Sequence, residues 1–344
     1  MCWPSPDPRP FAVARLDPAT YRRHPIHGED RAWPETNCYT DLVVEMAHAL
    51  RFDPVAMLPY TLAIDFEGDQ WTFFKPSSTE LYELYGFDIQ ELAISRPLVE
   101  HVVEQVEAGR AVLVEVDSWY LPDTAGTAYQ VAHAKTTIGV NRIDLAANRM
   151  GYFHNAGYFE VEGEDFRRVL RIGAGTGPER GQTGAGTGPD PGLPPYCEFV
   201  KWRRDFVPPR NGTLVGRSLE IARRHVERIP ATNPFPRFKE RFERDLGQLV
   251  CKSLCFHDYS FANLRQFGAS YELAATWLRW LAGHGISSVE EPAAALQAIA
   301  DGAKAFQFQL ARAVNRGRAL DTAPLDAMAD QWDSAMEPLR KRLA

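Results

Sequence analysis

Two patterns of apolar residues divide this sequence. In the first half, short stretches in which apolar and polar residues alternate are interspersed with stretches of helical spacing. After residue 195 almost all of the periodicity is helical, and Leu273, Trp277 and Leu281 fall on one side of a helix. The pattern therefore predicts an α+β fold for the first half and a helical domain for the second.

The individual elements follow from this periodicity and from the residues that begin and end helices. In the first half we expect helices at 38–50, 78–85 and 98–108, a hairpin of strands 62–66 and 71–75, and strands at 111–116, 135–141 and 149–153. In the second half we expect helices at 218–228, 238–255, 263–282, 292–316 and 324–343.

One segment supports no packed element. Residues 173–195 contain the motif GAGTGP twice and are rich in glycine and proline, which is typical of a mobile loop or linker. The predicted organisation is an α+β domain at 1–172, this linker at 173–195, and a helical domain at 196–344.

Charge and composition exclude several classes of protein. The 344 residues carry a formal net charge of -7, which argues against a broad nucleic-acid surface. No apolar run is long enough for a membrane span, and the first residues lack the apolar stretch of a signal peptide, so we expect a cytoplasmic protein without membrane contact. Five unevenly spaced cysteines predict reduced thiols rather than a disulfide scaffold. We expect no metal site.

Cys38 is the first candidate for chemistry, because it opens the helix predicted at 38–50. Unpaired N–H groups at a helix start favour the thiolate, the nucleophilic form of cysteine, although a buried structural cysteine is an equally good interpretation of this feature alone. A cysteine nucleophile needs a base and an orienting group. His133 precedes one strand, and Asn155 follows the next, so a strand hairpin would bring them together in the order Cys–His–Asn.

Other residues remain as alternates or support for this candidate site. His154 and Asp144 are alternatives to Asn155, since strand alternation lets only one of His154 and Asn155 face His133. No glutamine precedes Cys38 to hold an oxyanion, so Asn37 or backbone N–H groups would do so. Asp41, one turn after Cys38, would orient the thiol or a substrate amine, or would be a helix-start residue favoured by the dipole alone.

Two basic runs could form a local positive face on this acidic chain, although an ordinary charged helix face is the simpler interpretation. The residues concerned are Lys201, Arg203, Arg204, Arg237, Lys239, Arg241 and Arg244.

Three stretches carry a resemblance to a known family: NCYTDLVVEMAHAL, FFKPSSTELYELYGFD, and VDSWYLPD followed by His133. Over nearly the whole chain the sequence resembles the uncharacterised bacterial DUF1839 family. More distantly, residues 35–160 resemble the N-terminal domain of butirosin-biosynthesis acyltransferases, which move an aminoacyl group from a carrier protein to an aminoglycoside amine. The resemblance implies a papain-like (cysteine-peptidase-like) first domain in which Cys38, His133 and Asn155 are nucleophile, base and orienting residue.

The resemblance also implies a function. We expect a cysteine-dependent acyltransferase that moves an acyl or aminoacyl group from a carrier-protein thioester to an amine or hydroxyl of a small-molecule acceptor. No intrinsic cofactor is implied, apart from the phosphopantetheine arm of the partner carrier protein, which the basic face would dock. The alternatives are a cysteine peptidase or amidase, and a non-catalytic papain-like protein that binds a carrier protein or a peptide.

Overall fold

The computed structural model describes residues 11–173, 193–203, 205–252 and 254–343. The predicted linker at 173–195 therefore lies almost entirely outside the described residues. Within them the chain forms two compact units, and each unit is discontinuous in sequence. The α+β unit comprises residues 11–25, Cys38–Phe52 and Tyr85–Phe206, and the helical unit comprises Ile26–Asn37, Asp53–Leu84 and the described residues from Val207 onwards.

The α+β unit is built on one antiparallel sheet. Its described strands lie in the order β1-β6-β2-β3-β4-β5. Their bounds are β1 Phe87–Glu91, β2 Ala111–Asp117, β3 Lys135–Asp144, β4 Arg149–His154, β5 Gly157–Glu162 and β6 Cys197–Trp202. The strands predicted at 111–116, 135–141 and 149–153 are thus confirmed, whereas β1, β5 and β6 were not predicted.

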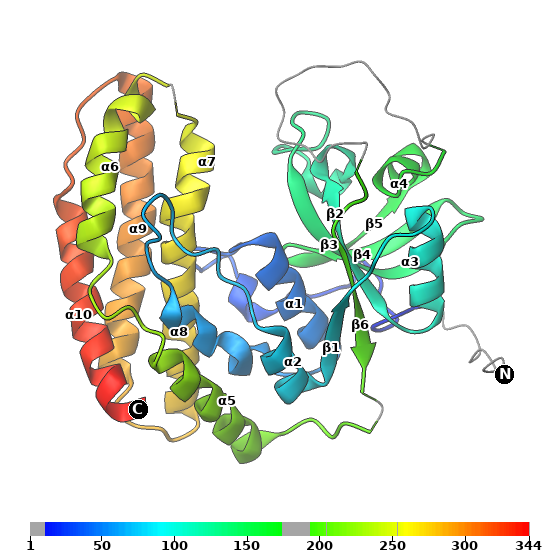
Figure 1. Ribbon diagram of the computed structural model, residues 1–344, viewed down its shortest axis with the longest axis horizontal. Coiled ribbons are helices and arrows are strands. Elements are labelled where there is room, and N and C mark those ends of the chain that lie inside the picture. Colours follow the sequence, from blue (N-terminus) through cyan, green and yellow to red (C-terminus); the bar gives the residue numbers. More distant parts are fainter. Residues whose placement is uncertain (1–10, 174–192, 204, 253, 344) are drawn as a thin grey trace. The chain divides into compact units, whose positions relative to one another are not determined.

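Helices cover both faces of this sheet. Helix α1, Cys38–Ala49, packs on β3, β4 and β5, while α3, Leu98–Glu107, packs on β2 and β3 from the opposite face (Figure 1). Leu42 and Met46 of α1 lie over Gly139 in the middle of β3. The short helices η3 Ser118–Tyr120, η4 Pro122–Thr124 and α4 Gly163–Val169 complete the unit.

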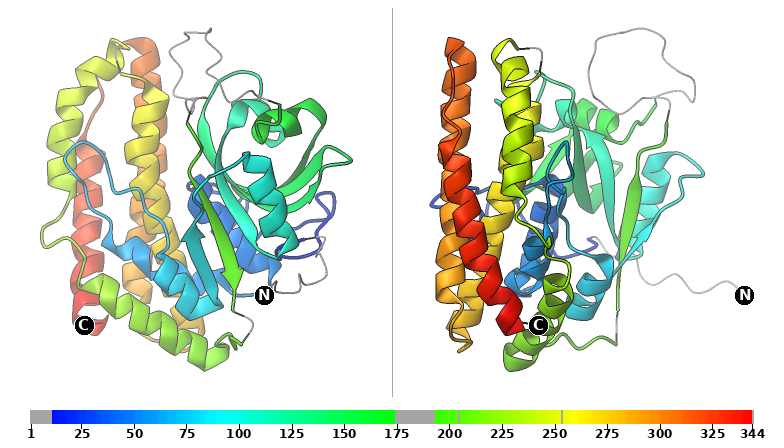
Figure 2. Two further views of the ribbon diagram at one scale, coloured as in Figure 1. Left: turned by 45° about the vertical axis from the view of Figure 1, so that its right-hand side comes forward. Right: turned by 60° about the vertical axis from the view of Figure 1, so that its left-hand side comes forward.

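The helical unit contains long helices that lie side by side (Figure 2). Its main helices are α5 Asn211–Val226, α6 Phe235–Val250, α7 Phe256–Ser260, α8 Gln266–Gly283, α9 Glu290–Arg316 and α10 Ala323–Leu343, and the π-helical turn η5 Phe261–Arg265 joins α7 to α8. The prediction of a helical second half is confirmed. The core of this unit is aromatic: Trp71 packs against Phe235 and Phe267 with ring centroids 5.1 and 4.9 Å apart.

The hairpin predicted at 62–66 and 71–75 is wrong. Residues Pro54–Ala63 form the 3-10 helix η2 instead, which Asp53 begins by accepting a hydrogen bond from the Val55 N–H. All that remains of the hairpin is an isolated bridge between Phe66 and Trp71. A short run of apolar residues fits a buried helix as well as a strand, and here the segment is buried among α5 and α8. Helix α2, Ser78–Tyr85, follows it as predicted.

Within the part of the chain that the structure describes, no helix combines the length and the apolar character needed to cross a membrane.

Candidate functional site

Cys38 is the first residue of α1 and its side chain is partly exposed. The first-turn N–H groups of a helix have no intrahelical partners, so they stabilise negative charge beside them. Among the other described cysteines, Cys197 is buried in β6, and burial raises the pKa of its thiol to about 12. Cys251 and Cys255 are exposed near the end of α6 and the start of α7. Cys38 is therefore a cysteine of the α+β unit that is both partly exposed and placed at the start of a helix.

His133 is held by a carboxylate that the sequence had not assigned to it. Its Nδ1 lies 2.6 Å from Oδ2 of Asp117, the last residue of β2. The imidazole also stacks on the indole of Trp119, with ring centroids 4.4 Å apart and an interplanar angle of 10°. Asp117 in turn accepts a hydrogen bond from the Trp119 N–H through its other oxygen. A carboxylate at Nδ1 keeps the proton there and leaves Nε2 as the basic nitrogen.

Among the described residues, none of the three predicted orienting residues is hydrogen-bonded to His133. Asn155 follows the end of β4 and has a φ of 43° in the turn to β5. His154 is buried, and its two nitrogens lie 2.5 Å from Asp123 Oδ2 and 2.7 Å from Thr136 Oγ1. Asp144 ends β3, the strand that begins just after His133. A strand of that length spans about 30 Å, which separates Asp144 from His133.

His154 belongs to a buried polar cluster with a structural role. Asp123, its partner, also accepts a hydrogen bond from the Tyr152 hydroxyl, and burial raises the pKa of that hydroxyl. The cluster ties η4, which contains Asp123, to β3 and β4. Both ring nitrogens of His154 are therefore occupied, so His154 cannot orient His133.

Among the described residues no hydrogen bond joins Cys38 and His133. The structure thus brings His133 together with Asp117 and Trp119, and it brings neither Asn155 nor Cys38 to hydrogen-bonding distance of the imidazole.

Asn37 and Asp41 flank Cys38 in the sequence, and both are buried. The side-chain amide of Asn37 donates a hydrogen bond of 2.9 Å to the carbonyl oxygen of Phe74. This hydrogen bond fixes the chain just before Cys38. Asp41 lies in the first turn of α1, where a carboxylate is favourable to the helix.

Each predicted docking residue that the structure describes has an acidic partner. Arg204 lies outside the described residues. The other ion pairs are Lys201 with Asp88, Arg203 with Asp205, Arg237 with Asp65, Lys239 with Asp326, Arg241 with Asp245, and Arg244 with Glu240. Arg244 has the longest of these distances, 3.9 Å, and its side chain is 66% exposed. Its charge is therefore the least neutralised by its acidic partner.

No group of three histidine, cysteine or acidic side chains that could hold a metal ion occurs within the described residues.

Two family models match the chain in succession. The model of the DUF1839 N-terminal domain matches residues 22–201, and the model of the DUF1839 C-terminal domain matches residues 211–341. A comparison with curated proteins gave no match.

Proposed function

Because the chain belongs to the DUF1839 family and carries both of its domains in order, we propose that it is a cysteine-dependent acyltransferase acting on a carrier-protein thioester. The reaction class comes from the resemblance of residues 35–160 to papain-like aminoacyl transferases. The observation that carries the proposal is the partly exposed thiol of Cys38 at the start of α1, in the same unit as an imidazole oriented by a carboxylate.

In the first half-reaction the sulfur of Cys38 attacks the thioester carbonyl of the carrier's phosphopantetheine arm. The new bond joins Sγ to the acyl carbon, and the pantetheine sulfur leaves. His133 takes the thiol proton on Nε2 and returns it to the departing sulfur, while Asp117 stabilises the imidazolium. Asp117 takes the orienting role that the sequence had given to Asn155.

In the second half-reaction an amine or hydroxyl of the small-molecule acceptor attacks the acyl-enzyme. His133 removes the proton of the acceptor, and the Cys38 sulfur leaves and is reprotonated. The product is an amide or an ester. If water replaces the acceptor, the same residues perform hydrolysis, which is the peptidase or amidase alternative.

The experiment is intact-protein mass spectrometry after incubation with acylated carrier proteins. The expected result is an acyl adduct on Cys38 that Cys38→Ala abolishes and Cys255→Ala, a change of another accessible thiol, leaves intact. Asp117→Asn should slow adduct formation about 100-fold or more, whereas Asn155→Ala should change it little. An adduct confined to Cys255 or Cys251, or none at all, would refute the transferase.

A second candidate is a non-catalytic protein that binds a carrier protein. The absence of a hydrogen bond between Cys38 and His133 within the described residues favours it, because sulfur and nitrogen of a catalytic pair are expected within about 3–5 Å even in an unliganded enzyme. Carrier binding that is equally strong in wild type and Cys38→Ala, with no acyl adduct on the wild type, would identify this second function.

A further inference from the structure

The seven residues before the thiol belong to the helical unit, although Cys38 itself belongs to the α+β unit. We call residues 31–37 the strap. The chain passes from one unit to the other at the peptide bond between Asn37 and Cys38. Whatever holds the strap in the helical unit therefore acts on Cys38 through the covalent chain.

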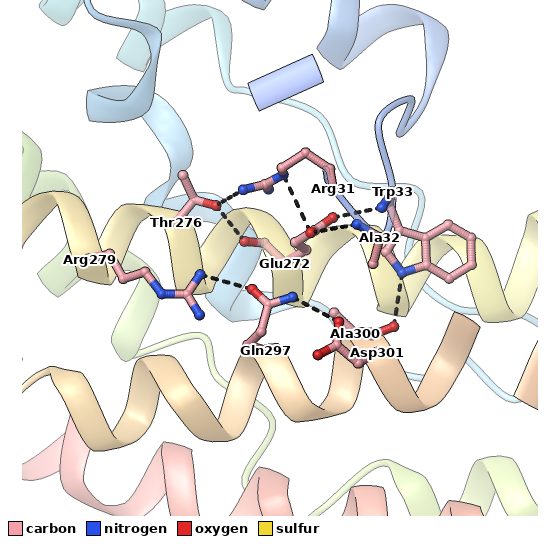
Figure 3. A network of polar contacts seen from close by, with 9 residues as sticks. All are labelled: Arg31, Ala32, Trp33, Glu272, Thr276, Arg279, Gln297, Ala300 and Asp301. Carbon is pink, nitrogen blue, oxygen red and sulfur yellow. Dashed lines mark hydrogen bonds and ion pairs between the residues drawn. The ribbon is translucent and has the colours of Figure 1, made fainter. Parts of the chain in front are cut away.

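Glu272 of α8 is the central anchor of the strap (Figure 3). Its Oε1 accepts the backbone N–H of Ala32 at 3.0 Å and its Oε2 accepts that of Trp33 at 2.9 Å. The Arg31 guanidinium lies 3.4 Å from Oε1 and donates to Thr276 Oγ1, also on α8. Glu272 is 2% exposed, so its charge depends on these partners.

Further contacts fix the strap up to its last residue. The Trp33 indole is buried and donates from Nε1 to the carbonyl of Ala300 on α9 (Figure 3). Arg265 donates to the carbonyl of Glu35 at 2.9 Å, and the Asn37 amide donates to Phe74 at 2.9 Å. The strap is thus held at five of its residues before the chain reaches Cys38.

We propose that Glu272 is a positioning residue for Cys38 and acts on it through the strap; this inference rests on the proposed function. Two backbone N–H groups and one guanidinium lose their shared acceptor when Glu272 is removed. The strap then loses two of its anchors, and the chain that leads into the first turn of α1 at Cys38 is less firmly held. Displacing a reacting atom by about 1 Å costs about 100-fold in rate.

The test is the rate of alkylation of each cysteine by iodoacetamide as a function of pH, read by peptide mass spectrometry in the full chain. Cys255, which is exposed and belongs to the helical unit, serves as an internal reference. Glu272→Ala should slow Cys38 about tenfold and move its pH midpoint upwards, leaving Cys255 unchanged. Glu272→Gln, which keeps an acceptor oxygen, should recover part of the rate.

Gln297→Ala is the matched control, because Gln297 lies in the same polar network but binds Arg279 and Asp301 rather than the strap (Figure 3). It should leave the Cys38 rate unchanged. If Glu272→Ala does not fold, Thr276→Val keeps the Glu272 carboxylate and removes only the two hydrogen bonds of Thr276 Oγ1, one from Arg31 and one to the Glu272 carbonyl. It should slow Cys38 about twofold to threefold.

A Cys38 rate that is unchanged in folded Glu272→Ala, or changed equally by Gln297→Ala, overturns the positioning role. The proposed function fails separately: in that case Cys38 forms no acyl adduct in the wild type, whatever the variants of Glu272 do to its alkylation.

Discussion

Arg241 binds the carboxylate of Asp245, one turn later on α6, through hydrogen bonds from Nε of 3.0 and 2.8 Å. The Asp245 side chain is 6% exposed, so its charge is almost completely removed from water. Arg244 faces Glu240 at 3.9 Å, and both of those side chains are largely exposed. Two arginines from the same basic run therefore have different roles.

Arg241→Glu should destabilise the protein, because it places a second negative charge beside a buried carboxylate. We expect a loss of about 1–3 kcal/mol in the free energy of unfolding. Arg244→Glu, the matched change on the exposed side, should stay within about 0.5 kcal/mol of wild type. Urea denaturation followed by circular dichroism measures both. Equal stability of the two variants would show that Asp245 does not depend on Arg241.

Carrier binding should depend on basic residues whose charge is exposed. Arg203→Glu combined with Arg244→Glu should weaken the affinity for an acidic carrier protein several-fold at low ionic strength and little at high ionic strength, since charges are screened beyond about 8 Å at physiological salt. Calorimetric titration at two salt concentrations is the measurement. Wild-type binding without salt dependence would exclude a docking role for these residues. Arg241 should be left intact in this experiment for the reason given above.

Stability should fall at alkaline pH, in part because of Cys197. Burial, followed by the nearby Glu198 carboxylate, raises the pKa of the Cys197 thiol to about 12 from an ordinary 9.0. Because the pKa is raised in the folded state, the stabilisation by the neutral thiol is complete below pH 9. It is lost as the pH rises from 9 towards 12, where the unfolded chain ionises and the folded protein does not. From pH 7 to 10 the loss should be about 1 kcal/mol. Urea unfolding of Cys197→Ala should show a smaller decline over this interval, and an equal decline would contradict the assignment.

Gly268→Ala should destabilise the helical unit. A Cβ at Gly268 would lie 2.7 Å from ring atoms of Trp33, and this indole is buried and hydrogen-bonded to the carbonyl of Ala300. We expect a cost of about 1–3 kcal/mol. At Gly247 on α6 nothing lies within 4 Å of an added Cβ, so Gly247→Ala should stabilise the helix by about 0.5–1 kcal/mol. Thermal unfolding of both variants provides the comparison, and two shifts of the same sign would contradict it.

The hydrophobic pattern and the capping residues correctly predicted long helices and strands that pair with their neighbours in the sequence. The helix at 38–50 and the strands at 135–141 and 149–153 correspond to α1, β3 and β4, because periodicity and capping residues act over short distances. Strands β1 and β6 pair with each other across more than 100 residues of sequence. Lys201 was interpreted as part of a basic run, yet it lies in β6 opposite Asp88 of β1.

The partner of His133 could not be predicted for a similar reason. Asp117 and His133 meet because β2 ends opposite the start of β3, where Asp117 pairs with Lys135. A shift of register by one residue would turn the carboxylate to the other face of the sheet. The segment VDSWYLPD that supported the family resemblance contains both Asp117 and Trp119, so the signal was present but carried no spatial information.

The interlaced division of the chain has a consequence for its synthesis. Segments Ile26–Asn37 and Asp53–Leu84 leave the ribosome early, but they pack on helices such as α8, which begins at Gln266. At about 5–20 residues per second, roughly 10 to 40 s pass between the translation of Leu84 and that of Gln266. During this interval Trp33 and Trp71 lack the partners that bury them, so the nascent chain has to keep large aromatic side chains from aggregation until its C-terminal helices have been made.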